Sequence, residues 1–366
     1  MDGKAIVPRA LGRKEPRMSE YISFDSHRKY TLAEREEALT GHVVQKRIEH
    51  WPGAFIGYLK QCPGDTPVAL EATGNWYWIV REIELSGHRA LLVHPRKAKL
   101  MMGMINKTDK LDVHGLNRLQ RNGTLPTVWI PPGELRDLRE LTRTRMVLST
   151  HRTRLKNRLS STLAKYGRRV VGFKDMFAAG ARAELESQVQ QLPEQTRWGC
   201  RMLLEQLDLT QRQIDEQEKR LEDLLRRTPE MEWLDTLPGV GLVLSAVIAL
   251  EVGDVGRFAT AERLASYAGT TPRVHSSGGK TRYGGLRPDV NRYLKWAFIE
   301  AANCAALQRE KHPERHVTVL YERLRPHKGH PKAIGAVARH LAESAYYVMS
   351  RREAYKDPAL GRTRKG

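Results

Sequence analysis

The chain has 366 residues, and its 62 lysines and arginines against 42 aspartates and glutamates give a formal net charge of +20 at pH 7. This length is ample for two or three domains. A cationic excess of this size favours a polyanionic partner, of which nucleic acid is the first candidate. A membrane surface is the alternative partner, but no stretch of the sequence is long and apolar enough to span a bilayer.

The cellular compartment is indicated by the start of the chain and by the cysteines. Residues 1–20 are basic and contain no apolar segment of the kind found in secretory signals. Cys62, Cys200 and Cys304 are far apart, which argues against a disulfide framework and against a cysteine-type zinc site. We therefore expect a cytoplasmic protein.

The first third of the sequence alternates short apolar runs with helical patterns. The expected strands are Tyr21–Asp25, Lys29–Ala33, Pro67–Glu71, Ala90–Val93 and Thr127–Ile130. Helical spacing of apolar residues covers Trp76–Leu85, and the run Pro95–Arg121 also tolerates a helix. Strands that alternate with helices on this scale predict an α/β domain with a central sheet.

The rest of the chain has a mainly helical pattern. A basic helix is expected from Gly133 to Tyr166, then a connector from Gly167 to Gly180, and helix again from Ala181 to Arg227 with a break at Pro193. A heptad stripe in the last of these fits a helical hairpin, pairing between subunits, or equally a plain intramolecular helix. The stripe consists of Leu203, Leu207, Ile214, Leu221 and Leu225.

Further helices are expected after Thr228. They include an apolar segment from Val243 to Val252, a helix that stops at Gly269, and helices over Val290–Ala306 and Ala333–Met349. Between them, the sequence predicts a glycine-rich polar loop from Thr270 to Gly285.

Four acidic residues are the first candidate site. Asp25 and Glu71 each end a predicted strand, and Asp109 and Asp112 share one face of a helix because they are three residues apart. Two like charges side by side are costly unless a cation neutralises them, and Mg²⁺ prefers carboxylate oxygens. Four converging carboxylates would hold one or two such ions for phosphodiester chemistry. The alternative is that each acid only caps a turn or pairs with a surface cation.

Candidate nucleic-acid contacts lie on the basic helix and on a later turn. Unpaired cations on the helix favour phosphate contact over a merely solvated face. The turn Pro238–Gly241 resembles the hairpin of a helix-hairpin-helix motif, although an ordinary turn between helices explains it equally well. The residues concerned are Arg143, Arg152, Arg154, Lys156, Arg158, Gly239 and Gly241.

The loop around Ser276 and Ser277 is the third candidate. A serine among small residues is exposed enough to act as a nucleophile, with Lys280, Arg282 and Arg292 nearby to hold a phosphate. The residues alone favour the simpler alternative, a flexible loop that contacts the nucleic-acid backbone. A nucleotide-hydrolase phosphate loop is excluded, because Val274 stands where that motif requires glycine.

A group of histidines has metal-like spacing, but the intervening prolines break any single helix face. We therefore expect nucleic-acid contacts or surface residues at these positions, which are His312, His316, His327 and His330.

Together these motifs resemble the IS one-ten family of bacterial insertion-sequence transposases over nearly the whole chain. The N-terminal half of the resemblance lies in Tyr21–Asp25, Leu70–Trp76, His94–Pro95 and Lys107–Asp112. The C-terminal half lies in Leu237–Gly241, Ala265–Gly269, His275–Lys280 and Asn291–Lys295. The closest fit is the subgroup with His-Ser-Ser-Gly-Gly in the serine loop. Ser23 departs from the glycine that is usual in the family.

This resemblance implies a RuvC-like domain of the ribonuclease-H type, with Asp25, Glu71, Asp109 and Asp112 as its acidic tetrad. It also implies a transposase domain whose loop serine bonds covalently to DNA, and motif position assigns that role to Ser277, with Ser276 in reserve. Members of the family excise and insert their element through a circular intermediate, guided by a non-coding bridge RNA that pairs with donor and target DNA. They act as dimers assembled into tetramers, in which domains of different subunits form a composite site.

The sequence therefore predicts a DNA transposase that uses Mg²⁺ or Mn²⁺ and is cytoplasmic and nucleoid-associated. The expected division is a basic arm (1–20), a RuvC-like domain with a basic helical extension (21–166), a helical linker (167–229), a transposase domain with a helix-hairpin-helix-like element (230–350) and a basic tail (351–366). The alternatives are a Holliday-junction-type nuclease that uses only the tetrad, and a non-catalytic nucleic-acid-packaging protein.

Overall fold

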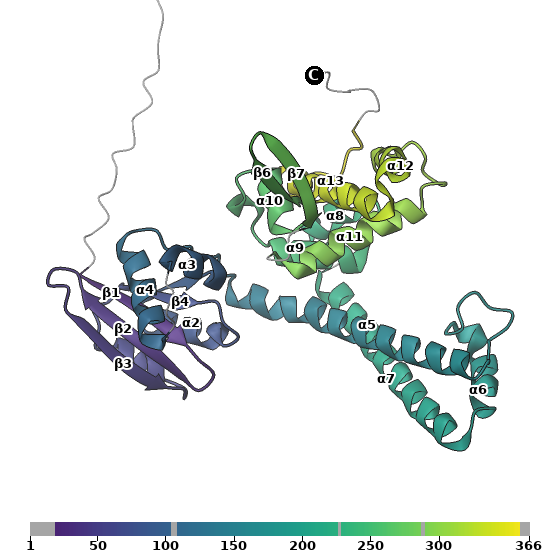
Figure 1. Cartoon of the computed structure of the whole chain (residues 1–366), viewed down its shortest axis with the longest axis horizontal. Helices are drawn as coiled ribbons and strands as arrows, with labels where there is room; N and C mark the ends of the chain where they lie inside the picture. The colour runs from purple at the N-terminus through teal and green to yellow at the C-terminus, as the bar shows by residue number, and fades with distance from the viewer. Residues whose placement is uncertain (1–18, 104–107, 226–227, 287–289, 359–366) are drawn as a thin grey trace, which may run out of the picture. The chain divides into compact units, whose positions relative to one another are not determined.

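The computed structural model describes residues 19–103, 108–225, 228–286 and 290–358. The chain divides into two compact units, 1–130 and 131–366 (Figure 1). Several predicted features lie wholly or partly outside the described residues: the basic arm, Lys107 of the acidic motif, and the end of the basic tail.

The first unit is built on a five-stranded mixed sheet in the order β3-β2-β1-β4-β5. Strand β1 pairs antiparallel with β2 and parallel with β4, β2 pairs antiparallel with β3, and β4 pairs parallel with β5. The strands are β1 (Glu20–Ser26), β2 (Tyr30–Glu37), β3 (Val43–Glu49), β4 (Pro67–Glu71) and β5 (Arg89–Val93).

Helices cover both faces of this sheet. On one face, Phe24 and Leu70 pack with α1 (Ala54–Leu59) and α2 (Trp76–Leu85). On the other face, Ala69 and Val93 pack with α3 (Pro95–Met102) and α4 (Asp109–Arg121). The central strands β1 and β4 are therefore buried on both sides. This fits the apolar run of β4, whereas β1 alternates apolar residues with the buried polar residues Ser23 and Asp25.

Most of the predicted elements of this unit are confirmed, namely the strands at β1, β2, β4 and β5 and the helix α2. Two predictions are wrong. The run 95–121 is not one helix, because α3 ends at Gly103, whose φ of 61° is left-handed, and α4 begins after its N-cap Thr108. Thr127–Ile130 is not a strand but makes an isolated bridge to Val93, since prolines at 126 and 131 leave no donors for a ladder on either side.

The second unit begins with two long helices that pack along each other. They are α5 (Gly133–Lys165) and α7 (Glu194–Leu225), with η1 (Ala179–Ala181) and the short helix α6 (Arg182–Gln190) between them in the chain (Figure 1). The predicted break at Pro193 is confirmed. Leucines of the heptad stripe are buried inside this unit: Leu207 packs with Leu155 and Leu159 of α5, and Leu221 packs with α8 and α9. Packing within the chain therefore accounts for this stripe.

The remaining helices form a core around α11 (Arg292–Leu307) and α13 (His330–Arg351). The helices packed with them are α8 (Pro229–Asp235), α9 (Leu242–Val252), α10 (Ala261–Tyr267) and α12 (His316–Lys328), with the short turn η2 (Val255–Arg257). Buried alanines such as Ala301 and Ala338 permit close approach of the helices. Within the described residues, no helix combines the length and the apolar character that crossing a membrane requires.

The turn between α8 and α9 contains Gly239, whose φ is +76°. A Cβ atom at this position would lie 2.1 Å from the carbonyl oxygen of Ala301 in α11. The glycine is therefore needed for a sharp turn that passes directly against the α11 backbone. This packing requirement explains Gly239 without any nucleic-acid contact.

The glycine-rich segment predicted as a loop is instead an antiparallel two-stranded ribbon, β6 (Pro272–Ser277) and β7 (Lys280–Leu286). Its turn is Gly278–Gly279, with φ of +56° and +75°. A two-residue hairpin with positive φ at both positions matches the twist of the flanking strands and strongly prefers such residues. The prediction of a loop was wrong because the two glycines are the turn and the residues on either side are its strands.

Candidate functional site

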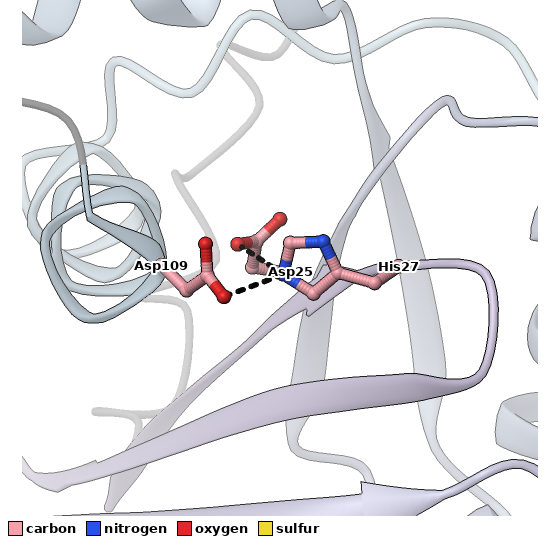
Figure 2. Close-up of side chains that lie close together, drawn as sticks. All are labelled: Asp25, His27 and Asp109. Carbon is pink, nitrogen blue, oxygen red and sulfur yellow. Dashed lines mark ion pairs between the residues drawn. The ribbon is translucent and has the colours of Figure 1, made fainter.

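Two of the four predicted acids lie together at one edge of the sheet in the first unit. Asp25 is near the end of β1 and is 8% exposed, and Asp109 is the first residue of α4. The side chain of His27 lies between them (Figure 2), with Nε2 3.3 Å from Oδ2 of Asp25 and 3.2 Å from Oδ2 of Asp109. The three side chains form a group whose ligand atoms all lie within 4.8 Å of one another.

The position of Asp109 is fixed by the start of α4 and by two hydrogen bonds to the sheet. Thr108 caps the helix by accepting a hydrogen bond from the amide of Leu111. The hydroxyl of Ser23, which is fully buried in β1, donates to the carbonyl of Val113 at 2.9 Å. The phenol of Tyr30 donates to Asp109 at 2.9 Å, and this bond raises the pKa of Tyr30. An acid in the first helical turn is also favoured by the helix dipole.

Asn75 connects the end of β1 to the segment that follows β4. Its amide donates to the carbonyl of His27 at 2.8 Å and contacts Oγ of Ser26 at 3.0 Å, while its own Oδ1 accepts from Thr73. The segment after Glu71 therefore holds the turn that carries His27 next to Asp25.

The structure brings together only part of the predicted tetrad. Glu71 is the last residue of β4 and Asp112 lies in the first turn of α4, and both are half-buried. Among the described residues, neither belongs to the group formed by Asp25, His27 and Asp109. His27 was not predicted as a site residue, although its position two residues after a strand-terminal acid was a usable signal.

The donor atoms of this group fit a divalent cation. Two carboxylates supply the oxygen ligands that Mg²⁺ and Mn²⁺ take, and the imidazole nitrogen is a better ligand for Mn²⁺ than for Mg²⁺. Nε2 of His27 faces a carboxylate oxygen of each aspartate, so the three donor atoms point toward one another. Asp25 and Asp109 would be the first ligands of an ion at this edge.

The serines lie at the tip of the β6–β7 ribbon, and the strand register separates them. Cross-strand partners are Val274 with Tyr283, Ser276 with Thr281, and Ser277 with Lys280. Because side chains alternate along a strand, Ser276 shares a face with Thr281, Val274 and Tyr283. Ser277 lies on the opposite face, with Lys280 directly across from it. The hydroxyl oxygens of Ser276 and Thr281 are 3.4 Å apart, so Ser276 has a hydroxyl partner on its own face.

The base of the ribbon is connected to the core by a buried polar network. Glu251 of α9 is 0% exposed and accepts hydrogen bonds from Arg143 of α5 at 2.8 and 3.2 Å and from Asn291 at 2.8 Å. Asn291 caps α11 by accepting from the amides of Tyr293 and Leu294. The backbone N–H of Asn291 donates to the carbonyl of Tyr267, at the end of α10 just before the ribbon.

Several cations of the basic helix α5 contact the protein itself. Arg139 is buried and donates to the carbonyls of Leu250 and Glu251, and burial lowers its pKa. Arg143 pairs with Glu251 and lies over the ring of Tyr293. The remaining contacts are Arg145 with Glu218, Arg152 with Gln211, and Lys156 with Asp175 and Phe177.

Other predicted nucleic-acid contacts remain exposed. Arg154 and Arg158 lie one helical turn apart on α5, and Lys280, Arg282 and Arg292 are exposed on or beside the ribbon. Gly241 precedes the first residue of α9 and has open space around it. The described histidines of the 312–330 section form no metal group: His330 bonds to Tyr321, and the amide of His316 bonds to Asp357.

Comparison with known proteins places both units in one class. Residues 231–317 match the family model described as "Transposase IS116/IS110/IS902 family". Residues 32–167 match a second transposase model, for the DEDD domain of IS110 elements, and this match includes Glu71, Asp109 and Asp112 but begins after Asp25. The class that the two models define is the transposase of a bacterial insertion sequence.

Three relatives agree with this assignment. A probable family 20 transposase of Pseudomonas aeruginosa is 26% identical over 64% of this chain and 70% of its own length. The transposase for insertion sequence element IS1111A of Coxiella burnetii is 24% identical over 79% of each chain. A putative transposase, y4pF/y4sB, of Sinorhizobium fredii is 24% identical over 94% of this chain and 88% of its own.

The chain belongs to the IS110 family of insertion-sequence transposases, and it is an enzyme that acts on DNA. The DEDD family match and the Asp25–His27–Asp109 group together support the use of a divalent metal ion.

Proposed function

We propose that this transposase excises and inserts its element through a covalent bond between Ser277 and DNA. The observation that carries the proposal is the register of the ribbon, which gives Ser277 an exposed position at the tip with Lys280 directly across from it. A phosphate approaching this face meets a hydroxyl and a cation together. Ser276 instead lies on the other face, beside Thr281.

The covalent step exchanges one ester of phosphate for another. Oγ of Ser277 forms a bond to the phosphorus of the scissile phosphate, while the bond from that phosphorus to one strand's oxygen breaks. The proton lost by the serine is balanced by the proton gained on the departing strand's hydroxyl. A hydroxyl of another strand then attacks the phosphoserine and returns Ser277 to its free form. Lys280 and Arg282 would stabilise the charge that develops on the phosphate oxygens.

Asp25 and Asp109 would hold the divalent ion, with Glu71 and Asp112 completing the tetrad of a RuvC-like, ribonuclease-H-type domain. When bound, an ion of this kind lowers the pKa of an attacking oxygen and neutralises charge on a phosphate. We propose Mg²⁺ as the physiological ion and Mn²⁺ as its substitute. Tyr30 and Asn75 would orient this group through their hydrogen bonds to Asp109 and to the carbonyl of His27.

We further propose that the acidic group of one subunit and the serine ribbon of another act on the same phosphate, in an assembly of dimers into a tetramer on donor and target DNA. A bridge RNA would select the two DNA sites. Arg154 and Arg158 are the exposed cations of α5 best suited to contact an RNA or DNA backbone. The functional boundaries at residues 21–166 and 230–350, and a cytoplasmic, nucleoid-associated location, are part of this proposal.

The test is to compare Ser277→Ala, Ser276→Ala and Asp109→Asn for strand cleavage and for protein–DNA adducts that survive denaturation. The reaction should contain the element's end sequences, the RNA transcribed from its non-coding flank, and Mg²⁺. We expect no adduct with Ser277→Ala, a near-normal yield with Ser276→Ala, and loss of both cleavage and adduct with Asp109→Asn.

Other outcomes favour other functions. Loss of cleavage with Asp109→Asn alone, and an unchanged result with Ser277→Ala, would favour a nuclease that hydrolyses DNA with water. Unchanged behaviour of all three variants would favour a packaging protein.

Addition of EDTA should stop the reaction of the unaltered protein, and Mn²⁺ should restore it.

A further inference from the structure

The face of the ribbon opposite Ser277 carries two large side chains that are open to solvent. Tyr283 is 73% exposed and Val274 is 57% exposed, and the two are cross-strand partners. An aromatic and a β-branched side chain in such a pair stabilise the ribbon by contact with each other. That contact does not explain why the outer side of the tyrosine ring is left open to solvent in a helical unit with an ample core.

The composition of the ribbon as a whole indicates what it binds. Between Pro272 and Leu286 the sequence contains Arg273, Lys280 and Arg282 and no acidic residue, and all three cations are exposed. A cationic two-stranded ribbon has the width that a groove of DNA admits. The register puts Lys280 and Arg282 on the Ser277 face and Tyr283 on the other face. A nucleic-acid strand that passes around the ribbon can therefore place phosphates against the cations and a base against the ring, which is the combination that single-strand-binding proteins use.

We propose that Tyr283, supported by Val274, stacks on an unpaired base of the DNA strand that Ser277 attacks. This inference rests on the proposed role of Ser277. Tyr283 is opposite Val274, three residues before Ser277, which at about 3.3 Å per residue is ~10 Å along the ribbon. The same length corresponds to about three nucleotides at 3.4 Å each. The ribbon therefore inserts at the cleavage point, with phosphate against its Ser277 face and a displaced base against its Tyr283 face.

This arrangement gives the two faces separable roles. Lys280 and Arg282 provide salt-dependent attraction to phosphate, whereas stacking on Tyr283 depends on the aromatic ring and only weakly on salt. Stacking on Tyr283 would hold one base of the DNA strand away from its neighbouring bases. This would fix the position of the nearby phosphate at the ribbon tip, next to Ser277. Tyr283 is thus a positioning residue rather than a catalytic one.

The test uses full-length protein and single-stranded oligonucleotides that contain one 2-aminopurine, whose fluorescence changes when it stacks on an aromatic ring. The variants are Tyr283→Phe, which keeps the ring, and Tyr283→Leu, which keeps the apolar bulk. Tyr347→Leu on α13 is the matched control, because Tyr347 is also an exposed tyrosine beside an arginine, Arg351.

We expect a fluorescence change with the unaltered protein, with Tyr283→Phe and with Tyr347→Leu, and none with Tyr283→Leu. Affinity should fall about 5- to 150-fold in Tyr283→Leu, the range typical of losing one stacked base. The salt dependence of binding should stay the same in that variant and decrease in Lys280→Gln.

The proposal is overturned if Tyr283→Leu binds as the unaltered protein does, or if Tyr283→Phe binds as poorly as Tyr283→Leu. A smaller assembly of Tyr283→Leu by light scattering, with unchanged DNA affinity, would show that this face contacts another copy of the chain instead.

The Ser277→Ala variant separates the stacking proposal from the proposal that Ser277 is the nucleophile. Stacking should persist in it while the adduct disappears, and an adduct that persists would contradict the nucleophile but not the stacking.

Discussion

His340 on α13 is a residue at which burial sets the charge state. Its ring lies 4.6 Å, centroid to centroid, from that of His316, and Nε2 contacts the hydroxyl of Tyr355. Burial, together with the nearby His316, lowers the pKa of His340 to about 4, although Asp357 opposes the shift. The folded protein therefore keeps this histidine neutral at pH values where the unfolded chain protonates it.

This lowered pKa predicts a loss of stability in mild acid. Between the unfolded pKa near 6.5 and the folded pKa near 4, the unfolded state binds more protons, so the free energy of unfolding falls as the pH falls. A shift of this size corresponds to about 3 kcal/mol over that interval. Denaturant unfolding between pH 7 and pH 4 should show this loss in the unaltered protein.

The His340→Gln variant is the control for this prediction. His50 in the first unit also has a pKa lowered by burial, so the difference between variant and unaltered protein isolates the contribution of His340. If the stability of the two proteins depends on pH to the same extent, His340 is not the source of the loss of stability in mild acid.

Ser23 shows what the sequence does and does not reveal at this scale. The family resemblance marks Ser23 as a departure from glycine. It does not reveal that the Ser23 hydroxyl donates to the carbonyl of Val113 in α4. In the same way, Asp25 was recognisable as a strand-terminal acid. The placement of His27 between two aspartates depends on how the start of α4, about 80 residues further along the chain, packs against β1. Contacts between side chains distant in sequence follow from packing, which residue patterns do not contain.

At the scale of the element, the basic helix α5 was predicted in its length but not in the direction of its side chains. Its arginines were interpreted as unpaired cations, yet Arg139 and Arg143 end on α9. Long basic helices with a buried face look the same in sequence as fully solvated ones, because arginine is compatible with both when an acid such as Glu251 is present. The acid lies more than a hundred residues away, so the pattern of α5 gave no signal.

The buried network should be a large contributor to stability. In Glu251→Gln the carboxylate that Arg139 and Arg143 face is lost, and leaving buried cations without it costs about 3 to 5 kcal/mol. Urea unfolding monitored by circular dichroism measures this loss.

The matched control is Glu218→Gln, which removes the partner of Arg145 at a more exposed position. Its cost should be no more than about 1 kcal/mol. Similar losses in Glu251→Gln and Glu218→Gln would contradict a structural role for the buried network.

The exposed cations of α5 should behave in the opposite way. The double variant Arg154→Gln/Arg158→Gln should keep its stability but bind nucleic acid more weakly. The plot of log affinity against log salt concentration has a negative slope, and its magnitude should decrease by about 2 for duplex DNA, because two phosphate contacts are lost. Filter binding over a range of salt concentrations measures this slope.

The control is the double variant Arg212→Gln/Arg220→Gln, which replaces two exposed arginines of α7. It lowers the net charge by the same amount as Arg154→Gln/Arg158→Gln. An identical reduction in Arg212→Gln/Arg220→Gln would mean that net charge, and not the Arg154–Arg158 face, sets the affinity.

The strands of the first unit were largely predictable, because β4 and β5 contain short apolar runs bounded by polar residues or glycine, and β1 alternates apolar residues with polar ones. Strand β3 was missed because it is an edge strand with most of its side chains exposed, and its polar sequence resembles a loop. The β6–β7 ribbon was missed for a related reason: with no core against either face, its strands lack alternating burial.

At the scale of the whole molecule, the sequence and the two family matches agree on one class of enzyme, while the division of labour between the units is our proposal. The first unit offers carboxylates gathered at a sheet edge, and the second offers an exposed hydroxyl on a cationic ribbon. Neither unit by itself contains both the acidic group and the serine. The proposed chemistry therefore requires the two units to meet at a phosphate, within one assembly.

The most direct measurement of this claim is the site of covalent attachment. The protein is reacted with its element's end DNA, RNA and Mg²⁺, digested with protease and nuclease, and the modified peptide is sequenced by mass spectrometry. We predict a nucleotide attached to Ser277 that is absent when the Asp109→Asn variant replaces the unaltered protein. Attachment at Ser276 or another residue, or cleaved DNA without any modified peptide, would contradict it.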